Sequence, residues 1–201
     1  MEIVYYFAST LIGYLVGSFP TGYLLARIKG VDPRQAGSGR TGGTNILRTA
    51  GKAPALLTVV GDLLKGALAV WIARSLVGTD AAAVLAGLAA VLGHNRSIFL
   101  GFRGGAGSMT NVGVVLALAP QVVPFVAVVA IAVALIWRTA SLASIAAVVA
   151  TLVGIVASVL LSWSPVVYLV YGFVVCVMIL FELRPNIQRL RSGSDRPVAT
   201  Y

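Results

Sequence analysis

Two glycine-rich polar segments interrupt an apolar chain, and they carry the residues best suited to chemistry. The first spans residues 37–45, with four glycines among its nine residues, and Arg48 follows it. Glycine lets the backbone adopt positive φ and approach a ligand closely, and successive free N–H groups form an anion-binding nest. Arginine adds charge and can grip a phosphate with two bonds. These residue types predict a phosphate-binding loop, with a flexible loop whose arginines face lipid headgroups as the alternative.

This segment matches neither of the two common nucleotide-binding loops. It is not a Walker loop, because it does not fit the pattern G-x-x-x-x-G-K-[ST]. It is not a Rossmann dinucleotide-binding loop either, because no strand precedes it. The residues that we expect to contact phosphate are Gly37, Gly39, Arg40 and Thr41, with further side-chain donors at Ser38, Thr44 and Asn45.

The second segment spans residues 101–108 and has a similar composition. Arg103 precedes a run of small residues that leads directly into an apolar stretch. Because the free N–H groups of a helix N-terminus favour an anion, this junction is a second candidate phosphate site. A tight turn between two packed spans is the alternative. The residues concerned are Arg103, Gly104, Gly105, Ala106 and Gly107.

Three titratable residues fall in or beside apolar stretches. Asp62 and Lys65 are three residues apart, which puts both on one helical face. Charges at such positions are expensive and are usually functional or paired, so they either serve the site or satisfy each other. His94 is the single histidine. Its ordinary pKa suits a general base, and hydrogen bonding to the backbone of a nearby loop is the alternative.

Ser141 and Ser144 stand close to Arg138 at the start of another apolar stretch. They are candidates either for capping a helix or for contacting a phosphate. The sequence offers no nucleophile–base pair, no metal-ligand cluster and no pair of adjacent carboxylates, so we expect no bound metal. These residues favour a reaction that relies on positioning and charge stabilisation over one with a covalent intermediate.

The composition determines which elements must position these groups. The chain has 201 residues, of which 59% are hydrophobic and 10% charged, with a mean hydropathy of +0.96. Apolar runs of about 20 residues, the span of a bilayer core, recur along it. We therefore expect an all-α integral membrane protein, with residues 1–201 forming one polytopic domain. The net charge of +9 is assigned to residues that flank the spans and face anionic headgroups, and not to nucleic-acid binding.

About seven transmembrane helices follow from the apolar pattern. The predicted spans are residues 3–28, 54–77, 81–93, 109–119, 122–137, 142–161 and 166–181. Lysine and arginine concentrate in segments 29–53 and 94–108, at Arg138 and in the tail, whereas only Arg74 lies near the alternate connections. The positive-inside rule then predicts an N-terminus outside and a cytoplasmic C-terminus, with both glycine segments on the cytoplasmic side.

Eight short stretches, in order along the chain, resemble the acyl-phosphate-dependent glycerol-3-phosphate acyltransferase family of bacterial membranes. They read GSFPTGYLLA (17–26), GVD with GSG (30–39), TNILRT (44–49), DLLKG (62–66), VLGHN (91–95), FRGG (102–105), SLAS (141–144) and NIQRL (186–190). The ordered set is specific, although each stretch alone is weak.

This resemblance implies a seven-helix enzyme of phospholipid synthesis in the bacterial inner membrane, with its active site on the cytoplasmic face. It implies transfer of a fatty acyl group from acyl phosphate to the 1-hydroxyl of glycerol 3-phosphate, giving lysophosphatidic acid and phosphate without a cofactor. The acyl chain would lie between spans, in contact with lipid. The oligomeric state stays open. The family's catalytic and phosphate-binding positions correspond here to Ser38, Thr41, Asn45, Arg48, residues 103–107, Ser141 or Ser144, and Asn186.

The sequence departs from the family pattern at several of these positions. The family usually has lysine at Ala106, histidine at Leu183 and asparagine at Arg40. Arg40 and Arg96 are additional cations that can replace the missing charge. A diverged, non-catalytic paralogue that binds phospholipid or acyl phosphate is a second interpretation. A small transporter is a third, although the sequence lacks the repeated halves typical of that class.

Overall fold

The structure is a computed structural model, and it describes residues 2–195. Its regular elements within that range are helical. They are α1 (Glu2–Ser18), α2 (Thr21–Ile28), α3 (Gly43–Ala50), α4 (Lys52–Val77), α5 (Asp80–Asn95), η1 (Ile98–Leu100), α6 (Ser108–Leu118), η2 (Pro120–Val122), α7 (Val123–Trp137), α8 (Ala140–Leu160), α9 (Tyr168–Glu182) and α10 (Arg184–Arg191). The expected all-α membrane class is confirmed.

Five helical segments of this range are long and apolar enough to cross a membrane, and a sixth is obtained if α9 and α10 form one span bent by 59°. The short α6 is apolar but has only 11 residues. Six of the seven predicted spans each correspond to one α-helix, and the first corresponds to α1 and α2 together. Large apolar side chains face outward, as lipid contact requires: Val128 and Leu135 of α7 are 67% and 71% exposed.

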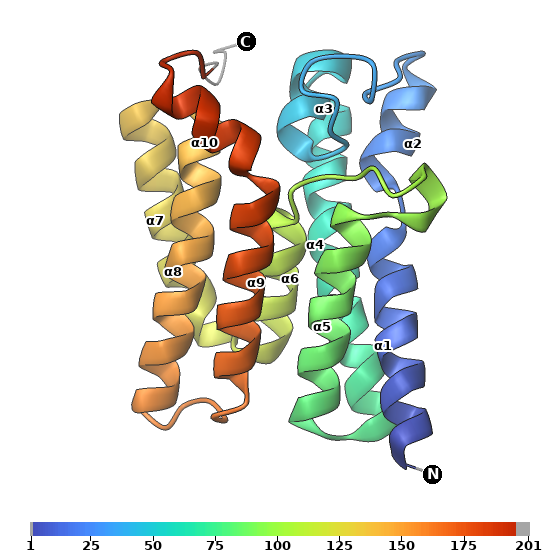
Figure 1. Ribbon diagram of the computed structural model, residues 1–201, viewed down its shortest axis with the longest axis vertical. Helices are drawn as coiled ribbons and strands as arrows, with labels where there is room; N and C mark the ends of the chain where they lie inside the picture. The colour runs from blue at the N-terminus through green and yellow to red at the C-terminus, as the bar shows by residue number, and fades with distance from the viewer. Residues whose placement is uncertain (1, 196–201) are drawn as a thin grey trace.

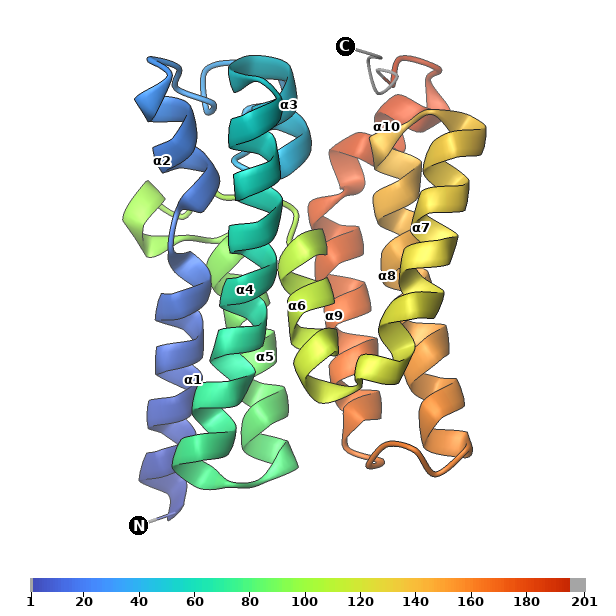
Figure 2. The same cartoon turned by 180° about the vertical axis from the view of Figure 1, so that it is seen from behind.

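The helices form two groups with α6 between them (Figures 1 and 2). The N-terminal group contains α1, α4 and α5, and the C-terminal group contains α7, α8 and α9. Helix α6 contacts members of both groups. Small residues allow close approach within this arrangement, as is common between membrane helices. A Cβ atom at Gly17 would overlap the backbone of Ala90, and one at Gly113 would overlap the backbone of Leu63.

The first predicted span is interrupted. We predicted one continuous helix over residues 3–28, but the chain breaks between α1 and α2 at Pro20, which has no N–H to donate. Two side chains from other parts of the chain donate hydrogen bonds to the backbone carbonyls at the break. Ser97 Oγ donates to the carbonyl of Ser18 at 2.6 Å, and Lys65 Nζ donates to that of Phe19 at 3.1 Å.

Buried polar contacts hold α6 against α8 and α9, and others link α4 to α6 and α9. Tyr171 of α9 donates to Asn111 of α6 at 2.8 Å, and Asn111 donates to Thr151 of α8 at 3.0 Å. Nearer the end that carries the N-terminus, Arg74 donates to the hydroxyl of Tyr168 at 2.6 Å and to the carbonyl of Ala117 at 2.8 Å. These contacts satisfy polar groups that would be costly in lipid.

Both glycine-rich segments lie toward the end of the bundle opposite the N-terminus, together with α3, α10 and the α7–α8 connection (Figure 1). The grouping of the basic connections at one end agrees with the predicted alternation. The side of the membrane that this end faces stays a prediction. The last residues of the basic tail, 196–201, lie outside the described range.

Candidate active site

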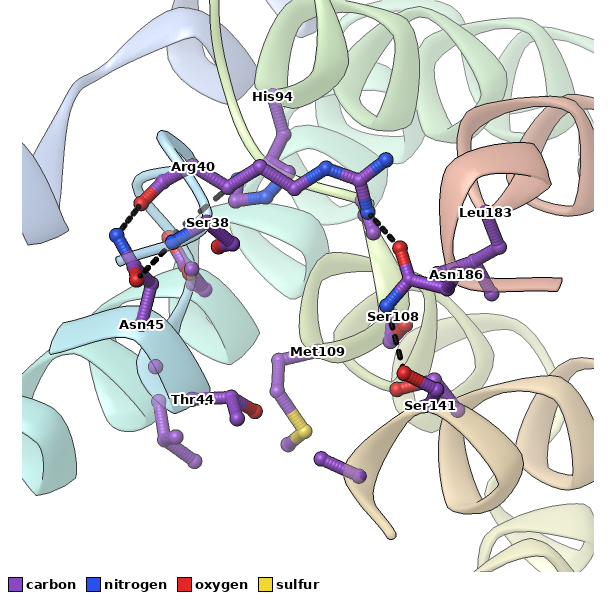
Figure 3. Close-up of a pocket in the computed structure, with 18 of the residues that line it drawn as sticks. Ser38, Arg40, Thr44, Asn45, His94, Ser108, Met109, Ser141, Leu183 and Asn186 are labelled. Atoms are coloured by element: carbon purple, nitrogen blue, oxygen red, sulfur yellow. Dashed lines mark hydrogen bonds and ion pairs between the residues drawn. The ribbon is translucent and has the colours of Figure 1, made fainter. Parts of the chain in front are cut away.

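A cavity of about 220 Å³ lies at this end of the bundle, between the first glycine-rich segment and the helices of the C-terminal group (Figure 3). Its lining is mainly polar, with basic side chains from both the first segment and α10. The lining residues are Ser38, Arg40, Gly42, Gly43, Thr44, Asn45, Arg48, Val59, Asp62, His94, Ala106, Gly107, Ser108, Met109, Ala140, Ser141, Ser144, Leu183, Asn186 and Arg189.

Three helices begin at the wall of this cavity. Their first residues, Gly43 of α3, Ser108 of α6 and Ala140 of α8, all line it. The unpaired N–H groups and the dipole of a helix N-terminus favour an anion. The Oγ atom of Ser108 is buried without a hydrogen-bond partner among the described residues. The arrangement therefore provides several donors for one bound anion.

Asn45 holds the first glycine-rich segment in shape. Its side chain is buried on α3, where Nδ2 approaches the carbonyls of Pro33, Ala36 and Arg40 at 3.0, 3.1 and 2.7 Å. Its Oδ1 accepts from the backbone N–H of Ser38 at 2.8 Å. These contacts use both Nδ2 hydrogens and bond Oδ1 to the segment, so the geometry suits Asn45 for positioning the segment.

Gly37 explains how the segment closes on Asn45. Its φ of +62° is accessible to glycine at little cost, and a Cβ atom there would overlap Asn45 Oδ1. Ser38 is exposed and lines the cavity, and Arg48 of α3 lines it from the same side. Local backbone geometry thus presents a hydroxyl and a guanidinium to the same space.

Arg40 reaches across the cavity to the C-terminal helices (Figure 3). It donates to Oδ1 of Asn186 at 3.0 Å and also to the backbone carbonyl of Glu182. Asn186 in turn donates to Ser141 Oγ at 2.7 Å. Burial lowers the pKa of the Arg40 guanidinium below its usual value, yet an arginine remains charged at neutral pH. A partly buried cation bonded to neutral oxygens makes this wall attractive to an anion.

Asp62 and His94 line the cavity from α4 and α5. Asp62 Oδ1 lies 2.8 Å from Lys65 Nζ and 3.5 Å from His94 Nδ1, and the three side chains are buried. The predicted placement of Asp62 and Lys65 on one face is therefore correct, and they form an ion pair. The alternative suggested for His94, hydrogen bonding to the backbone of a nearby loop, is replaced by this contact of its side chain with Asp62.

The second glycine-rich segment packs on His94. The backbone N–H of Gly105 donates to the carbonyl of His94 at 3.1 Å, and a Cβ atom at Gly105 would overlap the imidazole. Gly107, with φ of +89°, is the N-cap residue of α6. The prediction that this segment leads into a helix is correct. The Arg103 side chain is exposed and does not line the cavity.

Ser141 and Ser144 line the cavity, but the suggested capping role is wrong for both. The helix begins at Ala140, and its N-cap residue Thr139 makes no side-chain cap bond. Ser141 Oγ donates instead to Asp195 at 3.0 Å, and Asp195 lies 3.7 Å from Arg189 Nε. A capping prediction assumes that the helix starts at the serine, and this helix starts before it.

The cavity brings together twelve of the predicted site residues and leaves the others outside its lining. Those within it are Ser38, Arg40, Thr44, Asn45, Arg48, Asp62, His94, Ala106, Gly107, Ser141, Ser144 and Asn186. Those outside it are Gly37, Gly39, Thr41, Lys65, Arg103, Gly104 and Gly105. Sequence reasoning missed Ser108 and Arg189 as site residues. Ser108 had a signal, since it directly follows the glycine run; Arg189 had none beyond its charge. Residues 2–195 hold no group of three His, Cys, Asp or Glu side chains placed to bind a metal ion.

Comparison with known proteins gives concordant matches. The sequence profile of the family described as glycerol-3-phosphate acyltransferase matches residues 7–193. A protein named glycerol-3-phosphate acyltransferase from Roseiflexus sp. (strain RS-1) is 44% identical over 191 residues, covering 94% of this chain and 93% of that protein. The protein of the same name from Synechococcus sp. (strain JA-3-3Ab) is 42% identical over 191 residues, covering 93% of this chain and 90% of the relative.

A solved structure is similar over nearly its whole length. It is the crystal structure of PlsY (YgiH), an integral membrane glycerol 3-phosphate acyltransferase, in the glycerol 3-phosphate form. The TM-score is 0.88 at 36% sequence identity, with 97% of this chain and 96% of that chain covered. The lysophosphatidic acid form of the same protein gives a TM-score of 0.84.

Proposed function

The chain belongs to the glycerol-3-phosphate acyltransferase family and is a multi-pass membrane acyltransferase of phospholipid synthesis, and from this premise we propose its donor, acceptor and site. It transfers a fatty acyl group from acyl phosphate to the 1-hydroxyl of glycerol 3-phosphate. The products are lysophosphatidic acid and inorganic phosphate. The observation that carries this proposal is the cavity where three helix N-termini meet Arg40 and Arg48.

Both proposed substrates carry a phosphate, and the lining is suited to that group. Arg40, Arg48 and Arg189 supply positive charge around the space, and Ser38 and Ser108 supply hydroxyl groups. Helix N-termini add fixed partial positive charge without side-chain ordering. Charge-assisted hydrogen bonds contribute about 1.5–3 kcal/mol each. We propose that these groups hold the glycerol 3-phosphate and the phosphate of the donor together.

The transfer itself is a direct displacement. The 1-hydroxyl oxygen attacks the carbonyl carbon of the acyl phosphate, forming the ester C–O bond. The bond between the acyl carbon and the bridging oxygen breaks, and the hydroxyl proton moves to the departing phosphate. Ser38, exposed on the cavity wall, orients the hydroxyl. Holding the two reactants in line and stabilising the developing negative charge are the main contributions of the protein.

Arg40 compensates for the positive charge that is lost because Ala106 stands where the family usually has lysine. Ala106 and Leu183 both line the cavity, and Arg40 crosses it to Asn186. Arg96, the other cation suggested for this role, does not line the cavity and pairs instead with Glu182 at 2.8 Å. We therefore assign the replacement charge to Arg40 alone.

The site faces the cytoplasm in this proposal, and the membrane is the bacterial inner membrane. Supporting it, the basic connections and the cavity lie at one end of the bundle, opposite the N-terminus (Figure 1). Lysine and arginine concentrate on the cytoplasmic side of membrane proteins. Glycerol 3-phosphate would then reach the cavity from water, and the acyl chain would remain among the spans.

A comparison of donors tests the reaction. Purified protein in detergent is given glycerol 3-phosphate with one of three donors: acyl phosphate, acyl-CoA or acylated acyl carrier protein. All three donors carry an acyl group of the same chain length. We expect lysophosphatidic acid from acyl phosphate, with at most a trace from the thioesters. Efficient transfer from either thioester, with none from acyl phosphate, would overturn the assignment of the donor.

A further inference from the structure

A second cavity adjoins Arg40 at the junction of α9 and α10. Its volume is about 320 Å³, and we call it the α9–α10 cavity. It is lined by Arg40, Arg96, Phe181, Glu182, Arg184 and Gln188, together with Pro185. Arg40 is the one residue that the linings of the two cavities share.

Positive charge exceeds negative charge around this cavity. Three arginines face one carboxylate, Glu182, and that carboxylate is engaged by Arg96 at 2.8 and 3.2 Å. Arg40 bonds to the neutral oxygens of Asn186 and of the Glu182 backbone, and no carboxylate of residues 2–195 forms an ion pair with it. A pocket with two guanidinium groups that lack a carboxylate partner attracts an anion, and guanidinium geometry matches a phosphate.

The cavity also adjoins an apolar surface. The Arg184 guanidinium lies 3.3 Å from the centroid of the Phe181 ring, and Phe181 is 49% exposed in the last turn of α9. The end of a membrane span is where lipid headgroups lie, and basic pockets at this depth bind anionic ones. An exposed ring beside the cations favours a phosphate carried by a lipid over a free one.

We propose that the α9–α10 cavity binds the doubly charged phosphate monoester of a membrane lipid, and that this phosphate competes for Arg40 with the one in the active-site cavity. One guanidinium cannot neutralise two phosphates at once, so occupation of the outer cavity weakens binding in the inner one. Lipids with a phosphate monoester, the class to which the product belongs, would then restrain their own synthesis. This second part rests on the proposed function, whereas the binding site itself does not.

Binding is tested directly on the full chain in detergent, without turnover. Calorimetry measures the affinity for short-chain phosphatidic acid and, in a separate arm, for inorganic phosphate. We expect Arg184→Gln to weaken phosphatidic acid binding about tenfold, the effect of one lost charge-assisted contact. Arg191→Gln removes an exposed cation from the same helix outside both cavities, and it should bind like the unaltered protein.

A second variant protects the test against misfolding. Gln188→Glu places a negative charge in the cavity and removes no hydrogen bond that the structure contains, and it should also weaken binding. Thermal unfolding verifies that both variants fold. Unaltered affinity in both would overturn the proposal. Inorganic phosphate that binds as tightly as the lipid, with the same dependence on Arg184, would overturn the assignment to a lipid.

The competition is tested with the enzyme in phosphatidylcholine vesicles. We expect phosphatidic acid to raise KM for glycerol 3-phosphate about fivefold, a modest coupling between sites, and Arg184→Gln to abolish that rise. Phosphatidylglycerol at the same mole fraction controls for surface charge. An equal rise with both lipids, or a rise that persists in Arg184→Gln, would contradict the competition. If the enzyme showed no turnover, the proposed function would be contradicted. The calorimetric test of lipid binding would still stand, because it does not depend on activity.

Discussion

Arg40 donates a hydrogen bond of 3.0 Å to Oδ1 of Asn186, although 146 residues separate the two in sequence. The contact links the first glycine-rich segment to α10, and it continues through Asn186 to Ser141 of α8. It therefore joins the N-terminal group of helices to the C-terminal group at the candidate active site, and it brings a positive charge with it. Both effects should disappear when Arg40 is replaced.

Arg40→Gln should raise KM for glycerol 3-phosphate about tenfold or more, because a lost charge-assisted bond of about 1.5–3 kcal/mol corresponds to at least that factor. Steady-state kinetics measures the change. The matched control is Arg34→Gln, three residues before that segment, whose guanidinium pairs with Asp32 at 2.8 Å and does not line the cavity. Equal KM values for the two variants would contradict the role assigned to Arg40.

Asn45→Ala should lower kcat/KM about a hundredfold or more and destabilise the protein by about 1–3 kcal/mol, because buried backbone groups lose their partners. Activity and unfolding in detergent measure the two effects. Thr49→Val is the control, since it removes one hydroxyl bond to the Asn45 carbonyl within α3 and leaves the contacts of the Asn45 side chain in place. If Asn45→Ala kept wild-type kcat/KM, the segment would not need this amide.

Asp62→Asn should destabilise the protein by about 3–5 kcal/mol, because it leaves the buried Lys65 charge without its carboxylate. Unfolding in detergent measures this loss. Adding Lys65→Met removes the unpaired charge, and the double variant should recover at least part of the stability. A double variant less stable than Asp62→Asn alone would show that the ion pair is not the source of the effect.

Gly105→Ala should displace the second glycine-rich segment, because the added methyl group would overlap the imidazole of His94. We expect kcat/KM to fall about tenfold or more, since small shifts of positioning groups are costly. His94→Ala makes space for the methyl group, so the two substitutions should be non-additive in unfolding free energy. Strict additivity would mean that the ring and the glycine do not constrain each other.

The membrane class and most helix positions could be predicted from the sequence because long apolar runs leave few alternatives. The predicted span 122–137, for example, differs from α7 by one residue at its start. The two amphipathic helices α3 and α10 were not predicted. Each has eight residues, too few for a clear period, and the glycines at the start of α3 favour a loop.

The candidate site was only partly predictable. Glycine, hydroxyl and arginine in residues 37–45 indicate phosphate binding by composition alone, and the cavity includes several of them. The direction of each side chain depends on packing. Asn45 points back into its own segment, and Arg103 points away from the cavity. The contact of Arg40 with Asn186 joins distant helices, and no local pattern encodes it.

The reaction of the purified protein with acyl phosphate and glycerol 3-phosphate tests the central claim most directly. Inorganic phosphate and lysophosphatidic acid are quantified together over time. We predict one phosphate released for each lysophosphatidic acid formed, with neither product when glycerol 3-phosphate is omitted. Phosphate release that is independent of glycerol 3-phosphate, or the absence of both products when both substrates are present, would contradict the account.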